Sequence, residues 1–272
     1  MEATLKLIFL LINSYILLFA LEIQKAKVYD KNSHEVIGWA MSEKLDGIRA
    51  YWDGKNLLSK NSNQIHAPKW FISQLPPFEI DGELWTKRAD FENIQNIVLD
   101  KNPSKKWEEI TYNIFEVPNQ KGDFFQRLNV LEKWLLENNS KNIKIIPQTI
   151  CKNKNHLNEY LDTLVSKNAE GIIIKNPKID YFVGRSSNVL KVKKFYDSEG
   201  LVIGHNYNEK NEFKSLKIKL ENGVIFNLGG GFSNLQRKTP PKLNDIVTFK
   251  YYDFTKYGKP KFASFLRVRK KE

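Results

Sequence analysis

The sequence SEKLDGIR, residues 42–49, places a lysine, a carboxylate, a glycine and an arginine close together. A lysine amine is a nucleophile only when it has lost its proton, and nearby cations or burial can lower its pKa enough for that. Gly47 lets the backbone approach a ligand closely, and Arg49 offers a fork of donors to a phosphate. The stretch predicts that Lys44 meets a nucleotide phosphate, and a polar turn before a strand is the alternative.

The charge of the chain favours a polyanionic partner. Its 272 residues are enough for one large or two modest domains. They include 43 Lys and Arg against 31 Asp and Glu, a net charge of +12. From residue 195 onward there are 15 basic and 8 acidic residues, so +7 of the excess lies there. Such an excess attracts nucleic acid or anionic lipid, and a lysine-rich solvated surface is the alternative.

Cysteine and histidine indicate neither a disulfide framework nor a zinc site. Cys151 is the only cysteine, which excludes an intramolecular disulfide and a cysteine-based zinc site. The four histidines lack the spacing of metal ligands and are interpreted as surface or packing residues: His34, His66, His156 and His205.

The first twenty residues have the pattern of a signal peptide. Apolar runs at 7–12 and 15–20 are separated by two polar residues, and a membrane span needs about 20 apolar residues. Lys6 supplies the flanking cation of a secretory segment, although Glu2 offsets it. We therefore expect export to the periplasm, with membrane anchoring by an uncleaved segment as the alternative. No later stretch resembles a second span.

From residue 21 to residue 194 the pattern mixes strands and helices, which indicates an α/β or α+β domain. Strands are expected at 47–52, 55–59, 78–84, 110–117, 171–175 and 189–195, and helices at 124–137 and 156–166. Asp53 and Gly54 make the first two strands a hairpin, and Lys44 is expected in the loop before it. The residues expected to face the core from the helices are Phe125, Leu128, Leu131, Leu135, Leu157, Tyr160, Leu161, Leu164 and Val165.

From residue 195 to residue 272 the pattern changes to short β segments. They lie at 200–207, 213–220, 224–228, 245–252 and 262–268, with polar and glycine-rich connections. Five such strands are typical of a small Greek-key barrel of the oligonucleotide-binding type, the OB-fold. We place the domain boundary at about Lys194.

Charged residues recur beside the expected strands. DGE at 81–83 and EG at 170–171 each place a carboxylate next to a glycine, where it can bind a metal or a ribose hydroxyl, or act as a turn acid. In LKVK, residues 190–193, alternation puts Lys191 and Lys193 on one strand face. Two ammonium groups side by side repel each other unless an anion lies between them. The pair therefore indicates a phosphate site, and an exposed strand face is the alternative.

The order of these elements resembles the covalent nucleotidyltransferase superfamily of ATP-dependent ligases and capping enzymes. Four stretches look more narrowly like the minimal bacterial ATP-dependent DNA ligases of the E type: SEKLDGIRAYW at 42–52, DGELW at 81–85, GGGF at 229–232 with Arg237, and GKPKFASFLRVR at 258–269. The resemblance covers residues 29–269. It implies an α+β adenylation (nucleotidyltransferase) domain followed by an all-β OB-fold domain. It also implies ATP as the AMP donor, Mg²⁺ or Mn²⁺, and a monomer that binds nicked duplex DNA.

The resemblance assigns roles to individual residues. Lys44 attacks the α-phosphate of ATP and carries AMP, which passes to the 5′-phosphate of a nick before the 3′-hydroxyl displaces it. The implied nucleotide-binding residues are Ser42, Arg49, Glu83, Phe115, Glu170, Lys191, Lys193, Arg267 and Arg269. Of these, Glu83 and Glu170 are the implied metal ligands, and Phe115 is the adenine-stacking ring. Arg267 and Arg269 belong to the element that closes over pyrophosphate. The implied DNA-binding residues are Arg49, Lys60 and Arg185.

Two stretches depart from the family pattern. Lys60 and Ser62 stand where the family has an arginine and a glycine, so Lys60 binds a 5′-phosphate as a point charge without a bidentate fork. Glu116 follows the stacking Phe115, where an aspartate is usual.

These features predict an exported, ATP- and Mg²⁺-dependent DNA ligase. A GTP-using capping-type enzyme or an RNA ligase is the alternative within the same chemistry. A non-catalytic nucleic-acid-binding protein is the alternative from another class. The non-catalytic alternative is disfavoured because the chain retains all the residues that the resemblance implies for nucleotidyl transfer: Lys44, Glu83, Glu170, Lys191 and Lys193.

Overall fold

The structure, a computed structural model, describes residues 21–255 and 257–269. The chain divides into two compact units between Val192 and Lys193. The expected signal peptide at residues 1–20 lies outside the described residues. In the two described ranges, no helix has the length and apolar character that a membrane span requires.

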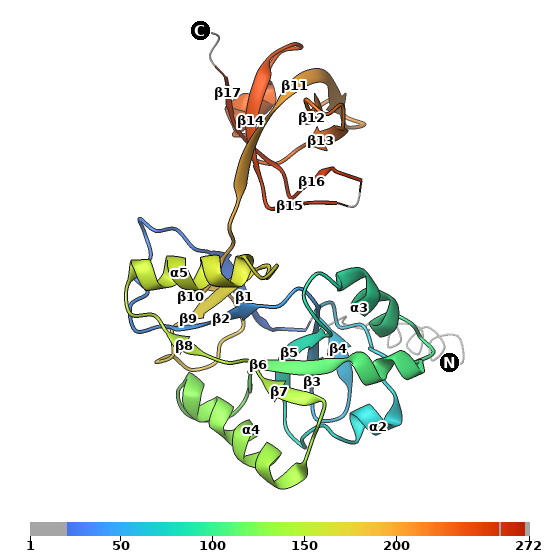
Figure 1. The fold of residues 1–272 in the computed structure, drawn as a ribbon, viewed down its shortest axis with the longest axis vertical. Helices are drawn as coiled ribbons and strands as arrows, with labels where there is room; N and C mark the ends of the chain where they lie inside the picture. Colours follow the sequence, from blue (N-terminus) through green and yellow to red (C-terminus); the bar gives the residue numbers. More distant parts are fainter. Residues whose placement is uncertain (1–20, 256, 270–272) are drawn as a thin grey trace, which may run out of the picture. The chain divides into compact units, whose positions relative to one another are not determined.

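Two five-stranded sheets form the first unit (Figure 1). The first sheet has the order β1 (Gln24–Val28), β10 (Gly184–Val192), β9 (Gly171–Lys175), β2 (Ala40–Lys44) and β8 (Thr149–Ile150). The second has the order β4 (Leu57–Ser59), β3 (Ile48–Trp52), β5 (Ile80–Trp85), β6 (Thr111–Glu116) and β7 (Ile143–Ile145). The pairs β1–β10 and β6–β7 are parallel and all other pairs in these two sheets are antiparallel.

The expected hairpin is confirmed as β3 and β4. Asp53 Oδ1 accepts hydrogen bonds from the backbone N–H groups of Lys55 and Asn56, at 2.8 and 2.6 Å. Gly54 has a φ of +92°, which an L side chain rarely adopts. Asp53 and Gly54 therefore make the turn for the reasons that the sequence indicated.

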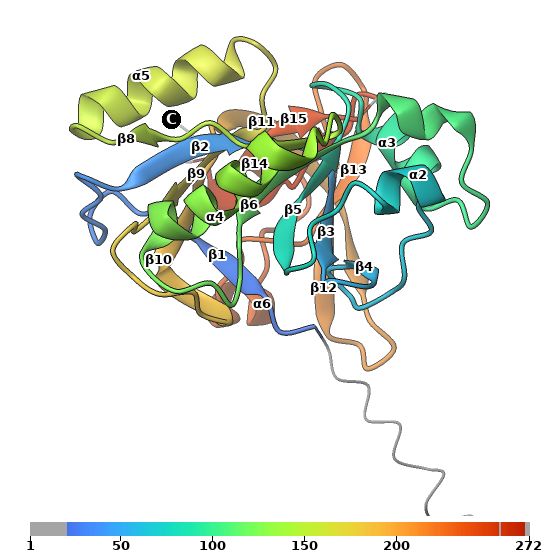
Figure 2. The same ribbon diagram turned by 90° about the horizontal axis from the view of Figure 1, so that it is seen from below.

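Each sheet has its own helices and its own apolar core (Figures 1 and 2). The core of the second sheet includes side chains from α2 (Lys69–Ile72), α3 (Phe91–Val98), the 3-10 helix η1 (Lys105–Glu109) and α4 (Phe124–Asn138). The core of the first sheet includes Leu157 and Leu161 from α5 (Lys154–Val165), packed with Ile172 and Ile174 of β9. The cavity described below can therefore form where the two sheets meet.

Both expected helices are confirmed, with one correction. Asp123 caps α4 by accepting from Gln126 N at 2.9 Å, and the Gln126 side chain accepts from Asp123 N at 2.8 Å. Leu128 is buried as expected, but Phe125 is exposed and Phe124 is buried in its place. Residue 124 precedes residue 128 by four positions, so Phe124 and not Phe125 shares its helix face.

The second unit is a five-stranded antiparallel sheet that curls toward a barrel. Its elements are β11 (Tyr196–Tyr207), β12 (Phe213–Lys219), β13 (Ile225–Leu228), α6 (Asn234–Lys238), β14 (Ile246–Tyr251), β15 (Asp253–Phe254), β16 (Pro260–Lys261) and β17 (Ser264–Val268). The sheet order is β13-β12-β11-β14-β17, and a bridge from Gly230 to Ser264 joins its two edges. A Cβ on Gly231 would lie 2.4 Å from Phe265 O, so only glycine fits at this junction. The all-β OB-fold prediction is confirmed.

One expected position was wrong. Lys44 is the last residue of β2, not a loop residue, because it pairs with Gly171 of β9. The sequence also did not predict the strand β1, which starts at Gln24. β1 reads QKAKV, in which only Ala26 and Val28 are apolar, and its partner β10 lies about 160 residues later in the chain.

Candidate active site

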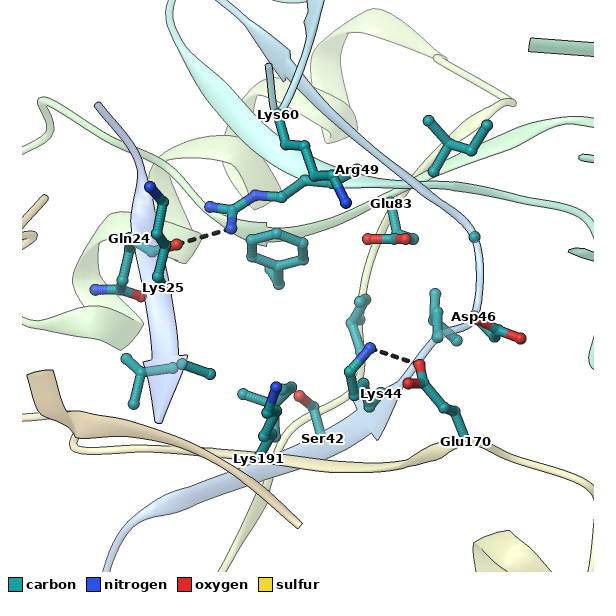
Figure 3. Close-up of a pocket in the computed structure, with 18 of the residues that line it drawn as sticks. Gln24, Lys25, Ser42, Lys44, Asp46, Arg49, Lys60, Glu83, Glu170 and Lys191 are labelled. Carbon is teal, nitrogen blue, oxygen red and sulfur yellow. Dashed lines mark hydrogen bonds and ion pairs between the residues drawn. The ribbon is translucent and has the colours of Figure 1, made fainter. Parts of the chain in front are cut away.

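A cavity of about 830 Å³ in the first unit is lined by residues of both sheets (Figure 3). It brings together nine of the predicted site residues: Ser42, Lys44, Arg49, Lys60, Glu83, Phe115, Glu170, Arg185 and Lys191. The other predicted residues, Lys193, Arg267 and Arg269, belong to the second unit.

Lys44 ends β2 with its amine beside a carboxylate. Lys44 Nζ donates a hydrogen bond to Glu170 Oε2 at 2.5 Å (Figure 3). Glu170 directly precedes β9, and Lys44 pairs with Gly171 in the first sheet. Strand pairing thus joins two residues that are 126 positions apart in the sequence. Ser42, two residues before Lys44, is buried on the same side of the strand.

Gly47 is required by the fold itself. A Cβ at this position would lie 2.4 Å from Leu84 O and 2.9 Å from Glu83 Cγ, so glycine permits a close approach to β5. It lets the loop after Lys44 pass tightly against the strand that carries Glu83. Gly47 also lines the cavity, and its expected approach to a ligand stays a prediction.

Glu83 brings a second carboxylate from the second sheet. Burial raises the pKa of Glu83 to about 8, against the opposing effect of Lys44 and Arg49. The neighbouring Glu170 carboxylate adds to the rise. A carboxyl group whose charged form is disfavoured in this way would be stabilised as an anion by a cation between the two acids.

The two carboxylates fit a magnesium ion that is also held by a nucleotide. Among the described residues there is no group of three or more His, Cys, Asp and Glu that could hold a metal by itself. Mg²⁺ is commonly bound through one or two carboxylates together with substrate phosphates and water. Glu83 and Glu170 supply such a set.

Arg49 is fixed by Asp81, the buried acid of the DGE stretch, a pairing that the sequence did not indicate. Its Nε and Nη2 donate to the two oxygens of Asp81 at 2.9 and 2.5 Å, and its Nη1 donates to Gln24 O at 2.7 Å. Asp81 is completely buried. The guanidinium carbon lies 5.2 Å from the centre of the Phe115 ring. Arg49 is thus a fixed cation next to the predicted adenine-stacking ring.

A buried ion-pair cluster of Glu116, Arg127 and Lys175, here called the Glu116 cluster, lies beside Phe115. Glu116 accepts hydrogen bonds from Arg127 Nε and Nη2 at 2.9 and 3.0 Å and from Lys175 Nζ at 2.9 Å. Lys175 Nζ also donates to Phe115 O at 3.1 Å. Burial acts to raise the pKa of Glu116, but Lys175 and Arg127 outweigh it and hold that pKa below its ordinary value. The glutamate that departs from the family pattern therefore serves a specific network.

Glu43, next to Lys44, forms an ion pair with an arginine that follows β5 of the second sheet. Arg88, which follows β5, donates from Nε and Nη2 to the two Glu43 oxygens, both at 2.7 Å. The pair links β2 of the first sheet to the segment after β5 of the second. The sequence did not predict this ion pair, because 45 positions separate its two residues and no local pattern links them.

Lys60 is presented by a hydrogen-bonded turn. Ser59 N donates to Asn63 O at 2.8 Å, and Ser62 N donates to Ser59 O at 2.9 Å. Ser62 has a φ of +64°, in the left-handed region that favours glycine. This conformation explains why a glycine suits the position where Ser62 departs from the family pattern.

The strand expected to run through Lys193 is shorter than predicted. β10 ends at Val192 and does not continue to Lys193, so the phosphate site shared by Lys191 and Lys193 stays a prediction. Lys193 Nζ instead lies 5.5 Å and 5.1 Å from the ring centres of Tyr252 and Phe262. The other two predicted residues of the second unit lie near its C-terminal strand: Arg267 belongs to β17, and Arg269 Nη1 donates to Glu199 Oε2 at 2.8 Å. The roles expected of Arg267 and Arg269 stay predictions.

Comparisons with known proteins agree with this geometry. Residues 24–193 match the family described as ATP dependent DNA ligase domain, and residues 208–269 match the DNA ligase OB-like domain. A DNA ligase of Haemophilus influenzae is 38% identical over 242 residues, which is 88% of this chain and 90% of that protein.

Solved structures are also similar to this chain. One from a structure–function study of DNA binding by Lig E DNA ligases has a TM-score of 0.85 and 40% identity, and covers 91% of this chain and 99% of that one. The DNA ligase-adenylate of Chlorella virus has a TM-score of 0.56 at 22% identity, covers 93% of this chain and 99% of that one, and shows a likeness of fold alone. The family matches and the Haemophilus relative together show that this chain belongs to the ATP-dependent DNA ligases.

Proposed function

We propose that this DNA ligase seals 5′-phosphate/3′-hydroxyl nicks in duplex DNA through an AMP carried on Lys44. The observation that carries the proposal is the Lys44–Glu170 contact of 2.5 Å in a cavity that also holds Glu83 and Phe115. A lysine so placed can form a covalent intermediate, which divides a difficult transfer into easier steps.

In the first step, Lys44 Nζ forms a bond to the α-phosphorus of ATP as the bond to pyrophosphate breaks. The amine must lose a proton to attack, and Glu170 accepts its hydrogen bond and is placed to receive that proton. The Lys191 ammonium stabilises negative charge that develops on the transferred phosphate. Mg²⁺ held by Glu83 and Glu170 supplies Lewis-acid stabilisation of the phosphate oxygens when it is bound.

The base and sugar are held by residues that do not react. Phe115 offers its ring face to adenine, and Ser42 lies two residues from the nucleophile. Arg49 is fixed by Asp81 and is positioned to contact the nucleotide or the nick. Ile173 also lines the cavity, and its apolar side chain can cover a flat base.

The DNA steps follow the same logic. An oxygen of the 5′-phosphate attacks the AMP phosphorus and releases Lys44, and the 3′-hydroxyl then attacks the 5′-phosphate and releases AMP. Lys60 and Arg185 are the cations we assign to the DNA. We further propose that Lys193, Arg267 and Arg269 bind the nucleotide's phosphates in a closed state of the enzyme, and that the protein acts as a monomer.

A gel assay on a nicked duplex tests the proposal. The purified protein with ATP and Mg²⁺ should convert nicked to sealed strands, and Lys44→Ala should convert none. Sealing with GTP but not ATP would favour a capping-type specificity. Sealing only when the nicked strand is RNA would favour an RNA ligase, and binding without any sealing would favour a non-catalytic protein.

A further inference from the structure

The rim of the cavity carries a cation that the sequence did not single out. Lys25 lies in β1 and lines the cavity together with Lys60 (Figure 3). Arg185 also lines the cavity. All three side chains are exposed. They come from different elements, since Lys60 follows β4 and Arg185 lies in β10.

The register of the first sheet places two of these cations next to each other. β1 and β10 run in parallel with Lys25 paired to Arg185. Arg185 Nη1 donates to Ala26 O at 2.8 Å, which holds the guanidinium against β1. Like charges on paired strands repel and destabilise a sheet. No carboxylate in the described part of the chain forms an ion pair with Lys25, Lys60 or Arg185.

Cations at the same cavity differ in this respect. Arg49 is paired with Asp81, Lys175 with Glu116, and Lys44 with Glu170. The three rim cations have no such partner among residues 21–255 and 257–269, so an anion from outside the protein would relieve their repulsion. A phosphate group with two negative charges is the ligand that such a cluster recognises.

A ligation reaction contains two sources of phosphate, ATP and the DNA, and the position of the rim cations decides between them. Figure 3 shows Lys25, Arg49 and Lys60 along one edge of the cavity and Lys44 with Glu170 along the other. ATP is small enough to enter and reach buried groups such as Ser42. A DNA duplex is not, so its phosphates have to meet exposed cations at the rim.

We propose that Lys25 completes, with Lys60 and Arg185, a rim site for the 5′-terminal phosphate of the DNA strand to be joined. The inference rests on the proposed function and adds to it a DNA-binding residue. In this site Lys25 and Lys60, from two separate elements, both contact the phosphate. Lys60 contributes one positive charge, and Lys25 adds a second.

The test compares two nicked duplexes that differ only at the nick, one with a 5′-phosphate and one with a 5′-hydroxyl. Binding is measured by fluorescence anisotropy with enzyme already carrying AMP, in EDTA so that no strand is consumed. The readout is the ratio of the two dissociation constants. A lost contact to a charged group is worth about 1.5–3 kcal/mol, so Lys25→Ala should reduce the preference for the 5′-phosphate about tenfold or more.

Matched variants separate this site from general electrostatics. Lys55→Ala removes the same charge from the turn of the β3–β4 hairpin, outside the cavity lining, and should leave the ratio unchanged. Lys25→Arg keeps the charge and should restore most of the ratio. In Lys25→Ala/Lys60→Ala the two losses should be non-additive, because both act on one phosphate.

Three results would overturn the inference. Equal weakening of both duplexes by Lys25→Ala would be a general charge effect. A rise in only the ATP concentration needed for AMP uptake would assign Lys25 to the triphosphate. Wild-type enzyme that takes up AMP but binds both nicks equally contradicts the rim site alone. Wild-type enzyme that takes up no AMP contradicts the proposed function itself.

Discussion

Lys175 Nζ lies 2.9 Å from Glu116 Oε2, in a buried cluster where Arg127 binds both oxygens of the same carboxylate. Lys175 ends β9 of the first sheet, and Glu116 ends β6 of the second. The contact therefore ties the two sheets together directly beside Phe115. Taking such charges out of water is costly, and only their mutual pairing offsets the cost.

Glu116→Gln should destabilise the protein strongly. It leaves Lys175 and Arg127 buried without their carboxylate, and breaking a buried pair in this way costs about 3–5 kcal/mol. Urea unfolding followed by tryptophan fluorescence measures the change. Glu116→Asp keeps the charge and should cost less. A Gln variant as stable as the wild type would show that the cluster contributes nothing to stability.

Glu83 should make stability depend on pH. The pKa of Glu83 is about 8 in the folded protein and 4.5 as its ordinary value. Between these values the folded state keeps a proton that the unfolded state has lost, so the free energy of unfolding falls as pH rises through this window. Glu83→Gln cannot titrate and should show a shallower fall. Parallel curves for the two proteins would contradict the raised pKa.

Arg49→Lys should reduce stability more than Arg88→Lys does. Both arginines bind a carboxylate through two nitrogens, but Asp81 is completely buried whereas Glu43 is partly exposed. A lysine cannot reproduce the fork, and a buried acceptor left unsatisfied costs about 1–3 kcal/mol. Thermal unfolding of both variants tests the order. Equal losses would mean that burial of Asp81 does not matter.

Local patterns in the sequence predicted much of the fold. The Asp53–Gly54 turn, the helices α4 and α5 and the strands of the second unit follow from residues close together in the chain. Such patterns also place Lys44, Glu83 and Glu170 beside strands. They could not predict β1, because its largely polar sequence becomes a strand only by pairing with β10, which lies far along the chain.

The sequence predicted the site residues better than it predicted their ion-pair partners. Arg49 needs Asp81 at a separation of 32 residues, and Glu116 needs Lys175 at 59. No local pattern encodes such pairs, because sheet register and packing bring them together. Strand alternation also misplaced Lys193, since it assumes that β10 continues beyond Val192.

Export stays a prediction from residues 1–20. If the segment is a signal peptide, cells that express the full chain should contain a periplasmic species shorter by about 20 residues. Fractionation with mass analysis of the recovered protein measures this. Full-length protein found only in the cytoplasm would contradict export, and full-length protein in the membrane fraction would favour an uncleaved anchor.

The most direct test of the account is the intact mass of the enzyme after reaction with ATP. The protein is first treated with pyrophosphate and Mg²⁺ to remove any AMP that it already carries, and is then incubated with ATP and Mg²⁺. We predict the gain of one AMP on the wild type, located on Lys44 by peptide mapping, and none on Lys44→Ala. A wild type that gains no AMP, or a Lys44→Ala variant that gains one, would contradict the central role of Lys44.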